Sequence, residues 1–195
     1  MIKKVIGITG SIGSGKSTVS SHLKQMGYQV IDCDKISHMM LLKNRKGYKQ
    51  VLNEFGTMIL DEEAHIDRKK LGAIIFNDTS KREKLNQILH PLIKEKVKSE
   101  IEKSSDTLVF MDCPLLFETD FHMLCDFSLV VYVDYDSQIR RIMKRDGIDF
   151  PTAIRKINAQ MPMEEKIKKA DLVIDNSHSE SDLDWQISQI LFKLN

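Results

Sequence analysis

Cysteine is scarce in this sequence of 195 residues, which contains only Cys33, Cys113 and Cys125 and no C-x-x-C pair. An odd number of cysteines without that spacing argues against a disulfide framework and a cysteine-based zinc site, and it is typical of a reducing compartment. The six histidines do not cluster at metal-ligand spacing either. We therefore expect each cysteine to be a small buried apolar residue.

The sequence also lacks an excess of charge of one sign and any long apolar run. Its 29 Lys and Arg residues nearly balance 28 Asp and Glu residues, so no overall basic field would attract nucleic acid or an anionic membrane. The apolar run in "MIKKVIGITG" is too short for a secretion signal, and no later run reaches membrane-spanning length. We expect a cytoplasmic, soluble protein without nucleic-acid or membrane partners, either a monomer or a weak homo-oligomer.

Short apolar runs rich in β-branched residues recur along the chain, and each is followed by a helical pattern. They cover residues 5–9, 30–32, 108–111, 129–133 and 172–174. Runs that are apolar on both faces and separated by helices indicate a buried parallel sheet. With 42% hydrophobic residues the chain can bury a core of its own, so we predict an α/β fold with three layers and a five-stranded parallel sheet.

Two of the later helices carry boundary signals. Ser181 followed by Asp184 predicts a capping box before an apolar stripe that includes Trp185, which we expect in the core. Asp136 is expected to cap the helix "SQIRRIMKRD", and Gly147 to end it in a left-handed conformation.

Two segments interrupt the alternation of strands and helices. Residues 36–100 and 146–168 are mainly helical and charged, and neither contains a run that would join the sheet. Insertions of this kind on an α/β core are where mobile lids and substrate-binding subdomains usually lie.

The stretch "GSIGSGKS", residues 10–17, matches the phosphate-loop pattern G-x-x-x-x-G-K-[ST] in full. It follows the strand "VIGIT" and precedes a helix, which is the context that the pattern requires. Glycines let the backbone turn so that its N–H groups point at phosphate, while Lys16 reaches the outer phosphates and Ser17 binds Mg²⁺. The expected nucleotide contacts are Ser11, Ile12, Gly13, Ser14, Gly15, Lys16, Ser17 and Thr18.

Polar residues stand where the other predicted strands end. Asp32 and Asp34 follow the second run, and an extended chain would place both carboxylates on one face. Asp34 is the better candidate for a general base, but the residues alone do not decide between the two. Asp112 ends the third run, at the place of a carboxylate that positions Mg²⁺ or its water.

After the fourth run, Arg141 and Arg145 stand four residues apart on one predicted helix and can converge on one anion. Phosphoryl transfer needs positive charge around the migrating group, which favours a role for both. Asn176 follows the fifth run in a polar turn that could contact a nucleobase.

A phosphate loop alone leaves the class of protein open. A regulatory GTPase usually carries N-K-x-D after a late strand, and this sequence does not contain that motif. Another nucleoside or nucleotide kinase is a second alternative, and a nucleic-acid motor a third, although the chain is short for a motor. The helical insertions favour a kinase, which must enclose an acceptor and exclude water.

In order along the chain, "GITGSIGSGKSTVS", "QVIDCDKIS", "IDRKKLGAIIFND", "LHPLIKEKV", "MDCPLLFET", "MKRDG", "NAQMPMEEK" and "ADLVIDNS" resemble the motifs of the bacterial dephospho-CoA kinase family. The resemblance covers essentially the whole chain. It implies a P-loop kinase fold and ATP-dependent phosphorylation of the ribose 3′-hydroxyl of dephospho-coenzyme A. It further implies a nucleotide-binding core of residues 1–35, 101–139 and 169–195, a helical CoA-binding domain of residues 36–100 and a lid of residues 140–168.

The resemblance also implies roles for single residues. Asp34 is the expected general base, and Arg145, with Arg141 one turn earlier, is expected on the ATP phosphates. Expected contacts to the acceptor are Arg68, His90 and Phe117. Two residues depart from the family's pattern: Ser11 replaces a glycine of the loop, which is tolerable unless that position needs a positive φ angle, and Cys33 stands beside Asp34.

Overall fold

The computed structural model describes residues 3–194 of the chain. By contacts the chain forms two compact units. The first, which we call the sheet unit, comprises the described residues up to Ile31 and those from Ser104 onward; the second, the helical unit, comprises Asp32–Lys103.

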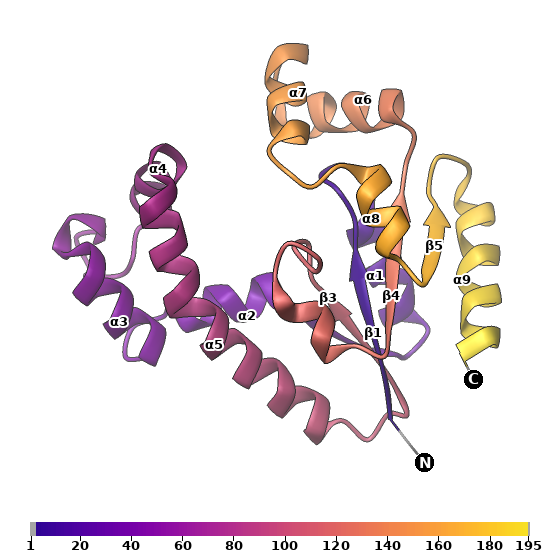
Figure 1. The fold of residues 1–195 in the computed structure, drawn as a ribbon, viewed down its shortest axis with the longest axis horizontal. Coiled ribbons are helices and arrows are strands. Elements are labelled where there is room, and N and C mark those ends of the chain that lie inside the picture. Colours follow the sequence, from indigo (N-terminus) through magenta and orange to yellow (C-terminus); the bar gives the residue numbers. More distant parts are fainter. Residues whose placement is uncertain (1–2, 195) are drawn as a thin grey trace. The chain divides into compact units, whose positions relative to one another are not determined.

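The sheet is five-stranded and parallel, as the sequence predicts. Its strands are β1 (Lys4–Thr9), β2 (Gln29–Asp32), β3 (Leu108–Asp112), β4 (Phe127–Tyr132) and β5 (Leu172–Asp175). Their order is β2-β3-β1-β4-β5, and β1 pairs in parallel with both β3 and β4. The central place of β1 brings the loop that follows it between the ends of its neighbours (Figure 1).

The core of the sheet unit lies between the strands and two helices, α1 (Lys16–Gln25) and α9 (Glu180–Leu194). Alternate residues of β1, such as Ile6 and Ile8, point to this face and are fully buried. On the other face Gly7 lies so close to Leu116 and Cys125 that a Cβ at this position would clash with both. Because both faces are covered, the strands read as continuous apolar runs.

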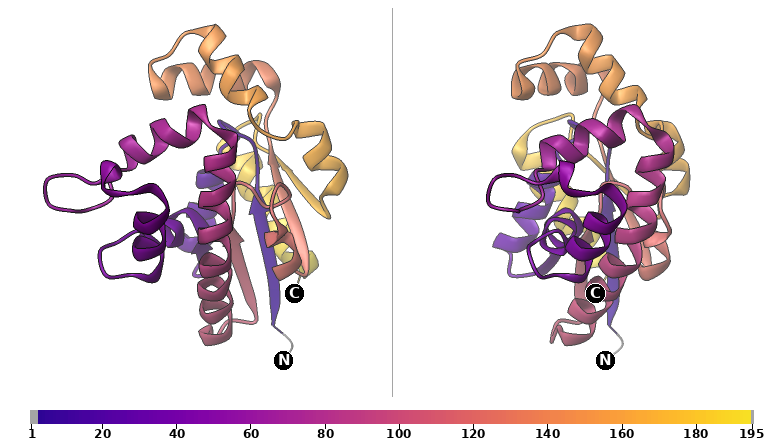
Figure 2. Two further views of the ribbon diagram at one scale, coloured as in Figure 1. Left: turned by 60° about the vertical axis from the view of Figure 1, so that its left-hand side comes forward. Right: turned by 90° about the vertical axis from the view of Figure 1, so that its left-hand side faces the viewer.

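Three further helices follow β4: α6 (Tyr135–Asp146), α7 (Phe150–Asn158) and α8 (Met163–Lys169). Figure 2 shows α6 and α7 beyond the carboxyl end of β1. Asp134, not Asp136, caps α6, because its carboxylate accepts the N–H of Ser137 and the helix begins earlier than predicted. Gly147 ends α6 with φ 63°, which confirms its predicted left-handed conformation.

Helix α9 begins at Glu180, so the predicted capping box is wrong by two residues. Ser179 and Asp182 form it reciprocally: the Ser179 N–H donates to the Asp182 carboxylate (3.2 Å), and the Asp182 N–H donates to the Ser179 hydroxyl (3.3 Å). Trp185 is 65% exposed, which contradicts its predicted place in the core. It stands two residues from the buried Leu183, about 200° around the helix.

Between β2 and β3 the chain forms the helices of the helical unit and no strand of the sheet. They are α2 (Cys33–Met40), α3 (Lys46–Phe55), the short 3₁₀ helix η1 (Thr57–Ile59), α4 (Arg68–Asn77) and α5 (Thr79–Lys103). Helix α5 contacts α2, α3 and α4 and buries Leu85, Leu89, Ile93 and Val97 at four-residue spacing. The unit is therefore built around one stripe of α5.

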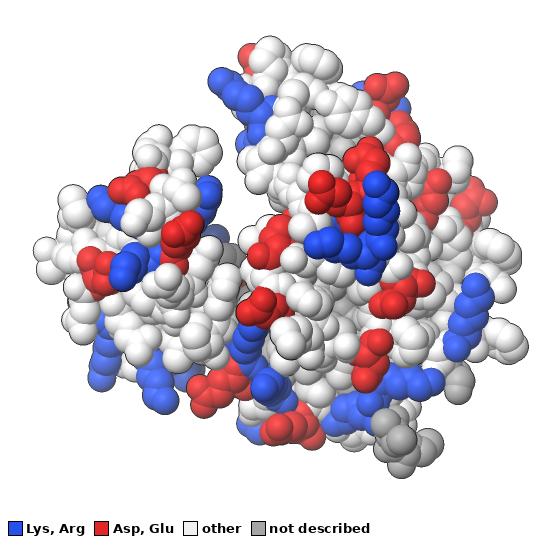
Figure 3. Space-filling model, in the orientation of Figure 1, with Lys and Arg blue, Asp and Glu red and all other residues white. Residues whose placement is uncertain are grey.

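The three cysteines are free thiols, and Cys33 and Cys113 are buried as predicted. Cys125 is only partly buried by residue exposure, but desolvation and the neighbouring Cys113 and Asp126 raise the pKa of its thiol to about 12. No helix within residues 3–194 is both long and apolar enough to cross a membrane. On the face shown in Figure 3, basic and acidic side chains are interspersed, in keeping with the balanced composition.

Candidate functional site

The loop between β1 and α1 has the backbone of a phosphate site. Gly13 and Gly15 have φ angles of 80° and 88°, which a residue with a Cβ rarely adopts. A Cβ on Gly13 would lie 2.8 Å from Ile142 Cγ1, and one on Gly15 would overlap the side chain of Asn176. Among the described residues, positive φ outside glycine is confined to Asn44 and Ala64, so Ser11 is tolerated in its position.

Within residues 3–194, the N–H groups of Gly13, Gly15, Lys16 and Ser17 have no protein acceptor. The Ser14 hydroxyl is buried and also has no hydrogen-bond partner there. Unpaired donors at a helix N-terminus attract an anion, and the helix dipole adds to that attraction. The residues present therefore fit bound phosphate.

Asp112 lies at the end of β3 and is almost wholly buried. One of its carboxylate oxygens accepts a hydrogen bond from Lys16 Nζ, and the other accepts one from Ser20 Oγ at 2.6 Å. Sequence reasoning missed Ser20, although it stands four residues after Lys16 and so shares its helix face. Ser17 and Thr18 are exposed in the first turn of α1.

Arg141 and Asn176 both bind the loop backbone. The Asn176 side chain donates to the Ser14 carbonyl at 2.9 Å. Arg141 donates to the Asn176 carbonyl at 2.8 Å and more weakly to the Ser14 carbonyl at 3.5 Å. In this arrangement the Asn176 amide nitrogen is engaged with the protein, and its predicted contact to a nucleobase stays a prediction.

Arg145 and Arg141 have different partners in this structure. Arg145 binds the Asp146 carboxylate and Arg141 the Asn176 carbonyl, so the two side chains share no partner within the protein. Arg145 is largely exposed and pairs with Asp146, Nε to Oδ1 at 2.7 Å. Lys156 binds the other oxygen of Asp146 at 2.7 Å. Hydrogen bonds from Arg145 and then Lys156 lower the pKa of Asp146, while its carboxylate raises the pKa of Arg145.

Two glutamines that sequence reasoning missed hold the peptide groups of Ile12. Gln138, buried on α6, donates its Nε2 to the Ile12 carbonyl at 2.7 Å. Gln160, between α7 and α8, accepts the Ile12 N–H at 2.7 Å. In the sequence, only Gln160 could have been found in advance, because it lies in "NAQMPMEEK", one of the segments that resemble the family's motifs. Because the Ile12 N–H already has an acceptor, it differs from the unpaired N–H groups of Gly13, Gly15, Lys16 and Ser17.

Lys166 on α8 is a fully buried lysine. Its ammonium group pairs with Glu118 Oε1 at 2.6 Å and donates to the Pro114 carbonyl at 3.2 Å. The same carbonyl accepts the Thr9 hydroxyl at 3.0 Å. The pair thus ties α8 to the segment that carries the half-buried Phe117, whose ring centroid is 6.4 Å from that of His122.

We expect Lys166→Met to lower the free energy of unfolding by about 3 kcal/mol, because it leaves the partly buried Glu118 carboxylate without its partner. Urea denaturation would measure this. The double variant Lys166→Met with Glu118→Gln should be more stable than the single variant, since no charge is left unpaired. Lys168→Met, at an exposed position of the same helix, is the control, and an equal loss there would contradict the role of the pair.

In the helical unit, Asp32 and Asp34 have different surroundings. Asp32 is the N-cap of α2, and its carboxylate accepts the Lys35 N–H at 2.8 Å. Because the helix begins at Cys33, the chain is not extended through Asp34, and the prediction that both carboxylates share a face on that ground is wrong. Asp34 is exposed in the first turn. The structural role of Asp32 leaves Asp34 as the stronger candidate base.

Arg68 and His90 lie on separate helices of the same unit. Arg68 is the exposed first residue of α4, which Asp67 caps. His90 is half-buried in α5, which continues through Pro91 as a single helix. Their contacts to an acceptor stay predictions.

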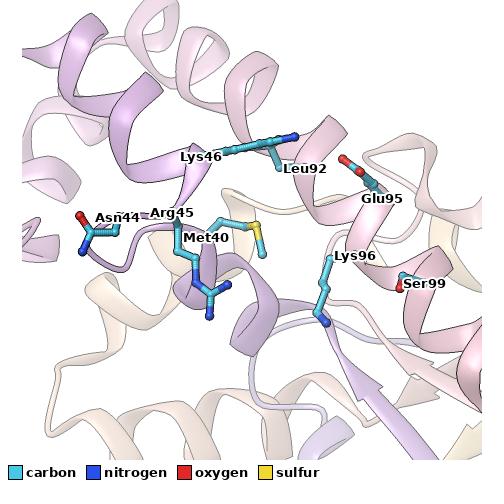
Figure 4. A pocket seen from close by; sticks show the side chains of 8 residues that line it. All are labelled: Met40, Asn44, Arg45, Lys46, Leu92, Glu95, Lys96 and Ser99. Atoms are coloured by element: carbon cyan, nitrogen blue, oxygen red, sulfur yellow. The ribbon is translucent and has the colours of Figure 1, made fainter.

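A cavity of about 400 Å³ lies within the helical unit, between the α2–α3 connection and α5. Figure 4 shows Arg45 and Lys96 pointing into the same region on either side of Met40. Glu95 also lines the cavity, and Lys96 pairs with Glu100 at 2.5 Å. The carboxylates offset much of the basic charge, so the cavity does not single out an anionic ligand.

The sequence is similar throughout to known proteins. Residues 4–182 match the family model for Dephospho-CoA kinase. A Dephospho-CoA kinase of Oceanobacillus iheyensis is 43% identical over 98% of each chain. Among solved structures, a protein of Thermus thermophilus has a TM-score of 0.86 at 31% identity over all of both chains. The Dephospho-CoA kinase of Campylobacter jejuni has a TM-score of 0.73 at 30% identity, over 99% of this chain and 98% of its own.

Proposed function

The chain belongs to the dephospho-CoA kinase family, and we infer from this that it transfers the γ-phosphoryl group of ATP to the ribose 3′-hydroxyl of dephospho-coenzyme A. The products are coenzyme A and ADP, so the reaction is the last step of coenzyme A biosynthesis. The enzyme is then a phosphotransferase with an alcohol group as acceptor. The observation that carries the proposal is the family match over residues 4–182, which takes in every motif described above.

The donor half of the reaction is proposed for the phosphate loop. The unpaired N–H groups of Gly13, Gly15, Lys16 and Ser17 would hold the ATP phosphates. The Lys16 ammonium group contacts Asp112 in this structure. Its side chain is long and flexible, so it can exchange that partner for a phosphate oxygen. A positive charge at this place stabilises the transferring phosphoryl group.

Mg²⁺ is proposed at Ser17 and Asp112, and the donor chemistry there fits it. Mg²⁺ prefers oxygen ligands and usually keeps several waters beside one or two carboxylates and the substrate phosphates. Within residues 3–194 no three His, Cys, Asp or Glu side chains form a metal cluster, which suits a metal held largely by phosphate and water. One Asp112 oxygen accepts the Ser20 hydroxyl, and the other would be freed if Lys16 turned to phosphate, so this residue would position the ion directly or through a water. The ion would neutralise charge on the phosphates.

The acceptor half is proposed for the helical unit and Phe117. Asp34 would accept the proton of the 3′-hydroxyl, since Asp32 is used as a helix cap. Arg68, His90 and Phe117 are proposed contacts to dephospho-coenzyme A, and residues 36–100 its binding domain. Residues 140–168 are proposed as a lid whose Arg145, together with Arg141, places positive charge near the phosphates.

A cytoplasmic location and a monomeric or weakly oligomeric state are part of the same proposal. The free thiols of all three cysteines support the location.

A coupled assay of ADP release tests the function. We expect turnover of ATP with dephospho-coenzyme A as acceptor and none above background with adenosine, nucleoside monophosphates or no acceptor. Turnover that depends on a nucleoside monophosphate would instead identify a nucleotide kinase. Slow GTP hydrolysis without an acceptor would identify a GTPase, and either result would overturn the proposal.

A further inference from the structure

Two nearly buried amide side chains hold the phosphate loop by its carbonyl groups. Gln138, 3% exposed, donates to the Ile12 carbonyl at 2.7 Å. Asn176, 9% exposed, donates to the Ser14 carbonyl at 2.9 Å. The two carbonyls belong to the residues that immediately precede Gly13 and Gly15.

Peptide geometry gives these hydrogen bonds a consequence for the neighbouring N–H groups. In a planar trans peptide the carbonyl of one residue and the N–H of the next point in opposite directions. A carbonyl held toward Gln138 therefore turns the Gly13 N–H the opposite way. In the same manner, a carbonyl held toward Asn176 orients the Gly15 N–H. Both N–H groups are among those without a protein acceptor within residues 3–194.

The glycines make such a hold necessary. Without a Cβ, Gly13 and Gly15 can rotate their peptides at little steric cost. A rotated peptide would present a carbonyl oxygen to the phosphates in place of an N–H donor, and the partial negative charge would repel the anion. Gln160 adds to the hold on Ile12, because it accepts the N–H of that residue. Arg141 donates to the backbone carbonyl of Asn176 and so supports the residue that holds the Ser14 carbonyl.

We propose that Gln138 and Asn176 are positioning residues for the ATP phosphates, acting through the Gly13 and Gly15 N–H groups and touching neither the base nor the reacting atoms. The proposal rests on the proposed function in one respect, the assignment of ATP to this loop. It assigns Gln138 a role that no motif of the sequence indicated. It also gives Asn176 a role different from the nucleobase contact predicted for it.

A ligand without a nucleobase separates the two roles of Asn176. We would measure the dissociation constants of ATP and of inorganic tripolyphosphate by calorimetry for the wild type, Gln138→Met and Asn176→Ala. Neutral replacements add no charge that would itself repel the ligands. We expect both ligands to bind about 10- to 100-fold more weakly in each variant, by the same factor, as for a lost hydrogen bond to a charged group. The KM for dephospho-coenzyme A should not change.

Controls separate a specific effect from a loss of stability. Gln189→Met replaces an exposed glutamine of α9, and Ile187→Val weakens the core without touching the loop. Neither should change the affinity for tripolyphosphate. If Gln138→Met or Asn176→Ala does not fold, Gln138→Asn and Asn176→Ser shorten the reach of the donor and retain a polar side chain.

Two results would overturn the inference. Weaker ATP binding with unchanged tripolyphosphate binding in Asn176→Ala would place that residue at the base, and unchanged binding of both ligands would leave both side chains purely structural. A wild type that binds neither ligand would contradict the proposed function itself. If the wild type binds both ligands and Gln138→Met and Asn176→Ala bind them equally well, only this inference is contradicted.

Discussion

Asp34→Asn is expected to lower kcat by about 10²- to 10⁴-fold while ATP still binds, because an amide cannot accept the proton of the attacking hydroxyl. The replacement has nearly the same size, so the first turn of α2 should stay intact. Asp34 is exposed there and does not cap the helix. The coupled ADP-release assay measures kcat, and calorimetry measures ATP affinity.

Asp32→Asn is the matched control for that experiment. Asn caps helices about as well as Asp, so the hydrogen bond to the Lys35 N–H should persist and activity should stay close to the wild type. Near-normal turnover of Asp34→Asn would refute the role of Asp34 as general base. An equal loss in both variants would mean that the two carboxylates act together.

Lys16→Ala is expected to lower kcat/KM by about 10²- to 10³-fold, because it removes a positive charge from the place where negative charge develops in the transition state. The loop backbone should still hold phosphate, since the unpaired N–H groups do not depend on this side chain. The loss should therefore appear more in kcat than in the affinity for ATP. Steady-state kinetics with both substrates varied would separate the two.

The contact between Lys16 and Asp112 calls for a second comparison. Removing the lysine leaves a buried carboxylate with Ser20 as its remaining partner, which could itself disturb the fold. The melting temperature should therefore be measured alongside activity. Lys24→Ala, at an exposed position of the same helix, is the control and should keep full activity. Unchanged kcat/KM in Lys16→Ala would contradict the role assigned to the loop.

The predicted sheet is correct in every strand because its signal is local. A parallel strand buried on both faces is mostly apolar, and the middle residues of β1, β3 and β4 are buried. The phosphate loop was predictable for a similar reason, since the positive φ angles of Gly13 and Gly15 require glycine wherever the loop lies.

Helix starts were less predictable, because several neighbouring residues can cap equally well. Asp134 and Asp136 are both good caps, and only the point where the chain leaves β4 decides between them. Trp185 shows a different limit, for the core: Leu183, and not Trp185, continues the buried stripe of α9, and Trp185, two residues from both Leu183 and Ile187, faces solvent.

The sequence by itself determined the chemistry that the loop can perform, the class of fold and the family, because these depend on short patterns read along one stretch of chain at a time. Only the tertiary structure decided which side chains hold the loop in its working conformation. Gln138 and Asn176 stand 126 and 162 residues from the carbonyls they bind. An amide side chain can bind any peptide group, and its sequence position does not tell which one.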